Sequence, residues 1–128
     1  MDAKRDWGHA RDYVQAMWKI LQQKKPDDFV IATGKQYSVR QFVNIVSKKL
    51  GYKIIWRGKG VNERGIDKNT NKVIIECDKK YFRPLDVNTL LGDSKKARKK
   101  LKWKPKINLN QLVDEMISLE MSTIENHN

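Results

Sequence analysis

The residues best suited to bind a ligand lie together roughly two-thirds of the way along the chain. Arg83 stands directly before Pro84, and Asp86 follows close behind. Pro84 fixes its own φ and keeps Arg83 extended, so the arginine side chain leaves the backbone in a defined direction. A guanidinium matches phosphate oxygens, and a carboxylate accepts hydrogen bonds from ribose hydroxyls. The pattern fits a nucleotide held by its diphosphate and sugar, or an Arg–Asp pair that closes a surface turn.

The composition is that of one small domain without covalent cross-links. The chain has 128 residues and one cysteine, Cys77, so no disulfide can form within it. No apolar segment follows the charged first residues, and no apolar run approaches the length of a membrane span. We therefore expect a single cytoplasmic domain over residues 1–128, in which Cys77 packs as a small apolar residue.

The net charge of +12 raises the question of nucleic-acid binding, because basic surfaces gain free energy by releasing counterions from phosphate backbones. The basic residues are spread along the chain, mostly near expected helix ends, where cations favour the helix dipole. No zinc-ligand spacing or RNA-binding aromatic motif accompanies them. The distribution favours a solvated basic surface over a nucleic-acid interface.

Apolar spacing and capping residues predict about four helices. The first runs from about residue 8 to 24, with Trp18 in its buried face. Two later helices begin with a capping box, in which the N-cap side chain and the side chain three residues on each accept a hydrogen bond from the other's backbone amide. A short basic helix lies between these two, and the second of them is the C-terminal helix. The capping residues expected at the four starts are His9, Ser38, Asp93 or Ser94, and Asn108.

Three short apolar runs predict strands, at residues 29–32, 53–56 and 73–75. The first two flank a predicted helix, and the order strand, helix, strand is typical of a parallel unit. Residues 57–71 combine glycines with charged residues and are expected to form a long mobile loop. The predicted fold is therefore a small α/β domain with short, partly parallel strands and about four helices, without a Rossmann domain.

Distinctive motifs occur through nearly the whole chain, in the order Arg5-Asp6-Trp7-Gly8-His9-Ala10, Asp28-Phe29-Val30-Ile31-Ala32-Thr33-Gly34, Tyr81-Phe82-Arg83-Pro84, Leu91-Gly92-Asp93 and Lys102-Trp103-Lys104-Pro105. In this order they resemble the GDP-mannose 4,6-dehydratases, which belong to the extended short-chain dehydrogenase/reductase family. The resemblance implies the C-terminal, substrate-binding part of such an enzyme, a lyase of nucleotide-sugar metabolism.

Two parts of that family's catalytic apparatus do not occur in the sequence. There is no Gly-x-x-Gly-x-x-Gly turn to bring the backbone close to a dinucleotide pyrophosphate, and no tyrosine is followed by lysine four positions on. The resemblance implies NADP for the complete enzyme. We expect this chain alone to bind no cofactor and no catalytic metal, and to have no dehydratase activity.

The resemblance assigns the substrate diphosphate to Arg5 and Arg83 and the ribose hydroxyls to Asp86. The family more usually has glutamate at the position of Asp86, so the side chain here reaches less far. The family commonly has aspartate at the position of Asn88. We expect weak binding of GDP or GDP-mannose, because a separate or missing Rossmann domain would supply the rest of the pocket. Apolar surface left uncovered by that domain should cause self-association. The alternatives are a stand-alone sugar-nucleotide-binding or interaction module and, less favoured by the sequence, a nucleic-acid-binding protein.

Overall fold

The chain forms two compact units. The structure, a computed structural model, describes residues 1–81 and 87–126. Unit 1 comprises residues 1–3 and 38–88, and unit 2 comprises residues 4–37 and 89–128. Arg83 and Asp86 fall outside the described residues, so their predicted pairing stays a prediction.

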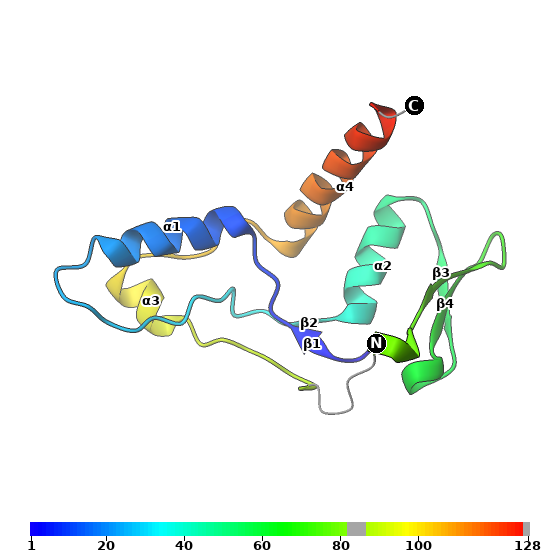
Figure 1. The fold of residues 1–128 in the computed structure, drawn as a ribbon, viewed down its shortest axis with the longest axis horizontal. Coiled ribbons are helices and arrows are strands. Elements are labelled where there is room, and N and C mark those ends of the chain that lie inside the picture. Colours follow the sequence, from blue (N-terminus) through cyan, green and yellow to red (C-terminus); the bar gives the residue numbers. More distant parts are fainter. Residues whose placement is uncertain (82–86, 127–128) are drawn as a thin grey trace. The chain divides into compact units, whose positions relative to one another are not determined.

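Unit 1 contains a three-stranded sheet with β4 in the middle (Figure 1). Both pairs of neighbouring strands are antiparallel, with Ile55 opposite Ile66 and Gly65 opposite Ile75. A side chain on Gly65 would press against Ile75, Ile54 and Trp56, so the glycine lets these residues close over β4. The elements of unit 1 are α2 (Val39–Lys49), β3 (Ile54–Arg57), the short 3-10 helix Gly60–Asn62, β4 (Arg64–Asp67), β5 (Val73–Glu76) and the 3-10 helix Lys79–Tyr81.

The prediction of partly parallel strands is wrong for this sheet, and the predicted loop over residues 57–71 is wrong where β4 forms. Strand β4 escaped prediction because Ile66 is its single large apolar residue. A side-chain-built turn defines its end instead, where Asp67 accepts hydrogen bonds from the Thr70 backbone amide at 3.2 Å and the Thr70 hydroxyl at 2.8 Å. Such a turn makes a tight hairpin possible without an apolar alternation.

Helix α2 starts as predicted, at a capping box. The Ser38 hydroxyl accepts from the Gln41 backbone amide at 3.1 Å, and the Gln41 side chain accepts from the Ser38 amide at 2.7 Å. Arg40, on the first turn, pairs with Glu63, which is buried, and stacks 5.2 Å above the Trp56 ring. These contacts hold α2 against the sheet in unit 1.

Unit 2 is built around a buried cluster of Ala16, Ala97, Leu101 and Trp103. Helices α1 and α3 supply the two alanines, and the two helices lie close together in Figure 1. The Trp103 indole donates a hydrogen bond to the Asp12 backbone oxygen at 2.9 Å, which ties the segment after α3 to α1. The elements of unit 2 are β1 (Lys4–Arg5), α1 (Ala10–Leu21), α3 (Lys95–Lys100) and α4 (Leu109–Glu125). Strand β1 pairs with β2 (Tyr37–Ser38), whose first residue belongs to unit 2 and whose second belongs to unit 1.

Several helix starts in unit 2 agree with the sequence. His9 caps α1, because its Nδ1 accepts from the Arg11 backbone amide at 3.0 Å. Asn108 and Gln111 form the expected capping box of α4. Ser94 is the N-cap residue of α3, while the Asp93 carboxylate accepts from the Lys95 amide at 2.9 Å.

Two expectations for unit 2 are wrong. Residues 29–32 do not form a strand, so the proposed parallel strand, helix, strand unit does not exist. Instead, Phe29 and Ile31 pack against the core cluster, and Ala32 is buried. Trp18 is 61% exposed, because α1 buries the side that carries Ala16 and leaves part of its broad apolar stripe uncovered.

Candidate functional site

Arg5 lies in β1 beside a hollow in unit 2. Its guanidinium donates a hydrogen bond to the Lys4 carbonyl oxygen at 2.8 Å. The hollow has a volume of about 350 Å³, which lies within the range of about 300–1,000 Å³ that is common for ligand pockets. Its walls are formed by Arg5, Asp6, Tyr13, residues 30–32 and residues 90–92. Of the three residues predicted to bind the diphosphate and the ribose, Arg5 therefore lies beside a cavity. Arg83 and Asp86 lie outside the described residues.

Asp6, the next residue, organises one wall of this hollow through three hydrogen bonds. Its Oδ1 accepts from the Thr33 amide at 3.0 Å and from the Thr33 hydroxyl at 2.5 Å. Its Oδ2 accepts from the Gly34 amide at 2.8 Å, where the backbone turns with a φ of +76°. Because both oxygens are engaged, Asp6 positions the turn after residue 32 and is a poor candidate for a general base.

Tyr13 closes the hollow from α1 and meets the backbone at Gly8. A Cβ atom on Gly8 would lie 2.5 Å from the Tyr13 Cζ and 2.9 Å from the Thr33 Cγ2, so glycine is required by space. Burial raises the pKa of the Tyr13 phenol, and the carboxylates of Asp6 and Asp12 raise that pKa further. The Tyr13 hydroxyl is therefore protonated at neutral pH and can donate a hydrogen bond.

The opposite wall depends on close contact between two extended segments. A Cβ atom on Gly92 would overlap the Ala32 side chain and lie 3.2 Å from the Val30 Cγ1. The glycine therefore lets residues 90–92 lie directly against residues 30–32. This contact gives a physical reason for two of the motifs in the sequence, although the sequence alone did not show that they meet.

The hollow has the chemistry of a binding site. Arg5 brings positive charge and several N–H donors to its edge, and Val30, Ile31, Leu90 and Leu91 give it apolar walls. Among residues 1–81 and 87–126, no group of three or more His, Cys, Asp or Glu residues could hold a metal ion. The arrangement suits an anionic ligand with an apolar part. Sequence reasoning found Arg5 but missed Tyr13 and also Asp6, whose hydrogen-bond partners lie 27 and 28 positions away.

A match to a protein-family model shows the family of this chain. The family model described as "GDP-mannose 4,6 dehydratase" matches residues 1–116. The chain belongs to the GDP-mannose 4,6-dehydratase family. Curated GDP-mannose 4,6-dehydratases from Caenorhabditis elegans, Homo sapiens and Vibrio cholerae are 52%, 51% and 47% identical to it, over 98%, 94% and 99% of this chain.

The chain spans about a third of the length of these GDP-mannose 4,6-dehydratases, between 32% and 37% of each. Its fold is also similar to a crystal structure of the Bordetella bronchiseptica enzyme WbmG in complex with NAD and UDP. The TM-score is 0.65 at 18% sequence identity, over 91% of this chain and 32% of WbmG. The family resemblance in the sequence is thus confirmed, and so is the α/β fold class.

Within residues 1–81 and 87–126, the junction of β2 and α2 does not fit a dinucleotide pyrophosphate. A dinucleotide turn needs glycines between a strand and a helix, so that backbone amides approach the pyrophosphate. At the junction of β2 and α2 the chain passes directly from Ser38 to Val39, and the Ser38 side chain caps the helix.

In the part of the chain that the structure describes, no helix is both long and apolar enough to cross a membrane.

Proposed function

We propose that this chain is the C-terminal, substrate-binding part of a GDP-mannose 4,6-dehydratase, which converts GDP-mannose to GDP-4-keto-6-deoxymannose with NADP. In this proposal Arg5 and Arg83 bind the substrate diphosphate, and Asp86 binds the ribose hydroxyls. The family match over residues 1–116 is the observation that carries it. The cofactor and the reacting groups belong to the remainder of the enzyme, so the 128-residue chain binds substrate and does not turn it over.

The position of Arg5 supports this assignment. Its side chain is half-buried at the edge of a hollow, and the Asp6 hydrogen bonds fix the wall beside it. A fixed arginine loses less conformational entropy on binding than one on an open surface. Two arginines can offset the charge of a diphosphate with bidentate hydrogen bonds, which a lysine cannot make.

We expect Arg83→Ala to weaken the binding of GDP by roughly ten- to a hundredfold, because a charge-assisted hydrogen bond contributes about 1.5–3 kcal/mol. Arg83→Lys should recover little, since an ammonium group cannot form the two parallel contacts. A chemical-shift titration of the full chain with GDP and GDP-mannose measures both variants, and Arg5→Ala should behave like Arg83→Ala.

The control is the double variant Lys24→Gln with Lys25→Gln, which removes two charges, one more than Arg83→Ala, from an exposed segment. In the described structure, neither lysine makes an ion pair or a side-chain hydrogen bond. If this control weakens GDP binding as much as Arg83→Ala does, net charge attracts the nucleotide and the proposed site is wrong.

We also expect the chain to self-associate through α1. Val14, Met17, Trp18 and Leu21 are between 60% and 80% exposed, and an apolar stripe of this kind is costly in water. Trp18→Glu should shift light scattering at high micromolar concentration toward the monomer. Gln22→Glu adds the same charge at the end of the helix and should leave the association unchanged. A wild-type chain that stays monomeric at this concentration would contradict the expectation.

A further inference from the structure

A second hollow in unit 2, with a volume of about 210 Å³, combines basic and aromatic side chains. Its basic residues come from segments that are far apart in the sequence and are Lys35, Arg98, Lys104 and Lys106. The remaining lining residues are Trp7, Thr33, Tyr37, Pro105, Ile107, Asn108 and Leu109. The residues of this hollow, which we call the basic–aromatic hollow, share none with the hollow beside Arg5.

The positive charge of the basic–aromatic hollow is offset only by carboxylates that do not line it, those of Asp6 and Asp12, which accept hydrogen bonds from the backbone of its walls. None of its 11 described lining residues is acidic. Some cations elsewhere in the unit have acidic partners: the Lys96 and Lys100 ammonium groups lie 2.5 Å and 2.9 Å from the Asp27 carboxylate and hold the Asp27 pKa below its usual range. Lys35 and Lys104, like Lys24 and Lys25, make no ion pair within the described structure. Several cations around one concave surface repel one another unless an anion lies between them.

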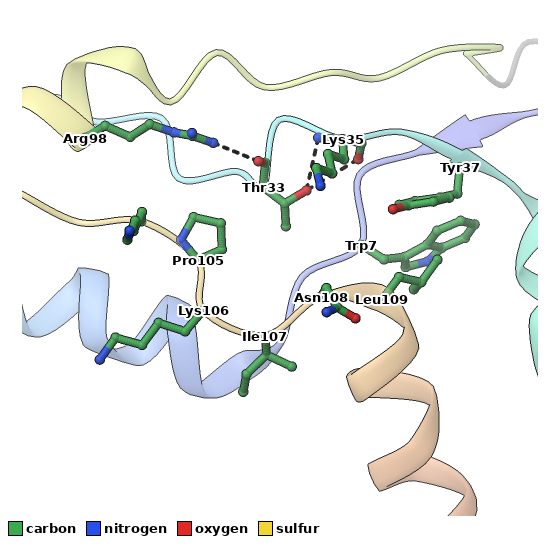
Figure 2. A pocket seen from close by; sticks show the side chains of 11 residues that line it. Trp7, Thr33, Lys35, Tyr37, Arg98, Pro105, Lys106, Ile107, Asn108 and Leu109 are labelled. Carbon is green, nitrogen blue, oxygen red and sulfur yellow. Dashed lines mark hydrogen bonds between the residues drawn. The ribbon is translucent and has the colours of Figure 1, made fainter.

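The two ends of the hollow differ in chemistry. Figure 2 shows Trp7, Tyr37 and Leu109 at one end and Arg98 at the other, with Thr33 and Lys35 between them. Trp7 and Tyr37 are half-buried, so each presents part of a ring to the hollow. Aromatic faces stack on planar heterocycles, and such stacking tolerates any base because every base has a π-face.

The walls of the hollow are held in place by buried or half-buried acceptors. On one side Asp6 fixes Thr33, whose backbone oxygen in turn accepts from the Arg98 guanidinium at 2.8 Å. On the other side the Asp12 carboxylate accepts from the Lys106 and Ile107 amides, at 2.9 Å each. A site whose shape exists before binding loses less free energy in ordering its side chains.

We propose that the basic–aromatic hollow binds a nucleoside monophosphate, with the base against Trp7 and Tyr37 and the phosphate among Lys35, Lys104 and Arg98. Its volume of about 210 Å³ lies below the range of about 300–1,000 Å³ common for ligand pockets, so the hollow holds part of the nucleotide and does not enclose it. The site is additional to the proposed substrate site. No lining residue selects one base, so AMP and GMP bind alike.

A two-dimensional NMR titration of the full chain with AMP tests the proposal. The Trp7 indole and the Thr33 amide signals should shift saturably, whereas the Trp56 indole signal, from unit 1, should not. GMP should give the same shifts at a similar concentration. Inorganic phosphate and adenosine should each bind at least about tenfold more weakly than AMP, because each makes part of the contacts.

Two pairs of variants locate the binding. Lys35→Gln with Lys104→Gln should weaken AMP binding by at least about tenfold, since exposed charge-assisted contacts are lost without disturbing the fold. Lys24→Gln with Lys25→Gln removes equal charge elsewhere and should leave AMP binding unchanged. Arg5→Ala and Arg83→Ala should also leave it unchanged, which separates this site from the proposed GDP-mannose site.

The outcomes are distinguishable. Equal weakening by both lysine pairs would show attraction by net charge and overturn the proposal. Loss of AMP binding in Arg83→Ala would place the nucleotide in the substrate site instead. Phosphate that binds as tightly as AMP would show an anion site without aromatic recognition. Failure of GDP-mannose binding, with these AMP shifts intact, would affect the proposed function alone.

Discussion

Asp12→Ala is expected to lower the free energy of unfolding of unit 2 by about 3–4 kcal/mol, because a buried acceptor of two backbone hydrogen bonds is lost. The Asp12 side chain is 3% exposed, and one of its oxygens accepts from the amides of Lys106 and Ile107. Alanine leaves both amides without that acceptor. These residues directly precede Asn108, the cap of α4, so the start of the last helix should loosen as well.

Asp12→Asn separates the hydrogen bonds from the charge. An amide oxygen can still accept from one or both backbone donors, but as a neutral acceptor it contributes about half as much. Urea unfolding followed by the indole signal of Trp103, which is buried in the same unit, measures both variants. Asp28→Ala is the control: it makes the same change of charge at an exposed residue and should alter stability by less than about 0.5 kcal/mol. Equal losses in Asp12→Ala and Asp28→Ala would contradict the proposed role.

The helix starts were predictable because their determinants are local. In both capping boxes, at Ser38 and Asn108, the partners are three residues apart, so the sequence contains the whole interaction. The cap at His9 also uses an amide two residues away. The Arg5-containing motif could be recognised as well, and the family match confirmed its origin.

The strand pattern was harder to predict because apolar runs do not reveal how they are buried. Residues 29–32 have the composition of a strand, yet Phe29 and Ile31 pack against the core cluster, Ala32 is buried against Gly92, and Val30 stays exposed. Strand β4 has little apolar character, but it pairs on both sides. Trp18 likewise has the spacing of a residue on a buried helix face. The apolar stripe of α1 is wider than the part of the helix that unit 2 covers, so Trp18 stays exposed.

The residues that shape the candidate sites could not be found from sequence because their partners are remote. Asp6 acts on residues 27 or 28 positions away, and Asp12 on residues 94 or 95 positions away. Local reasoning assigns a short acidic side chain near a helix start to capping or to the helix dipole. The same limit applies to the basic–aromatic hollow, whose cations looked like part of an evenly spread surface charge.

Gly8→Ala is expected to destabilise unit 2 by about 2–3 kcal/mol through overpacking. Gly8 does not have a positive φ, so alanine is compatible with the backbone and the cost arises from space. The added Cβ would overlap the Tyr13 ring and lie 2.9 Å from the Thr33 Cγ2. Tyr13 packs against the core cluster and cannot move without opening it. The midpoint of urea unfolding at the Trp103 indole should fall accordingly.

A double-mutant cycle with Tyr13→Leu tests this cause directly. Leucine lacks the ring atom and hydroxyl that the new Cβ would meet, so Gly8→Ala should cost at least about 1 kcal/mol less in the Tyr13→Leu background. Gly51→Ala is the contrasting control, because Gly51 has a φ of +81° and no atom within 4 Å of an added Cβ. There the cost is one of backbone strain, about 1–2 kcal/mol, and Tyr13→Leu should not relieve it. If the costs of Gly8→Ala and Tyr13→Leu were simply additive, the close contact between Gly8 and Tyr13 would not be the reason for glycine in this motif.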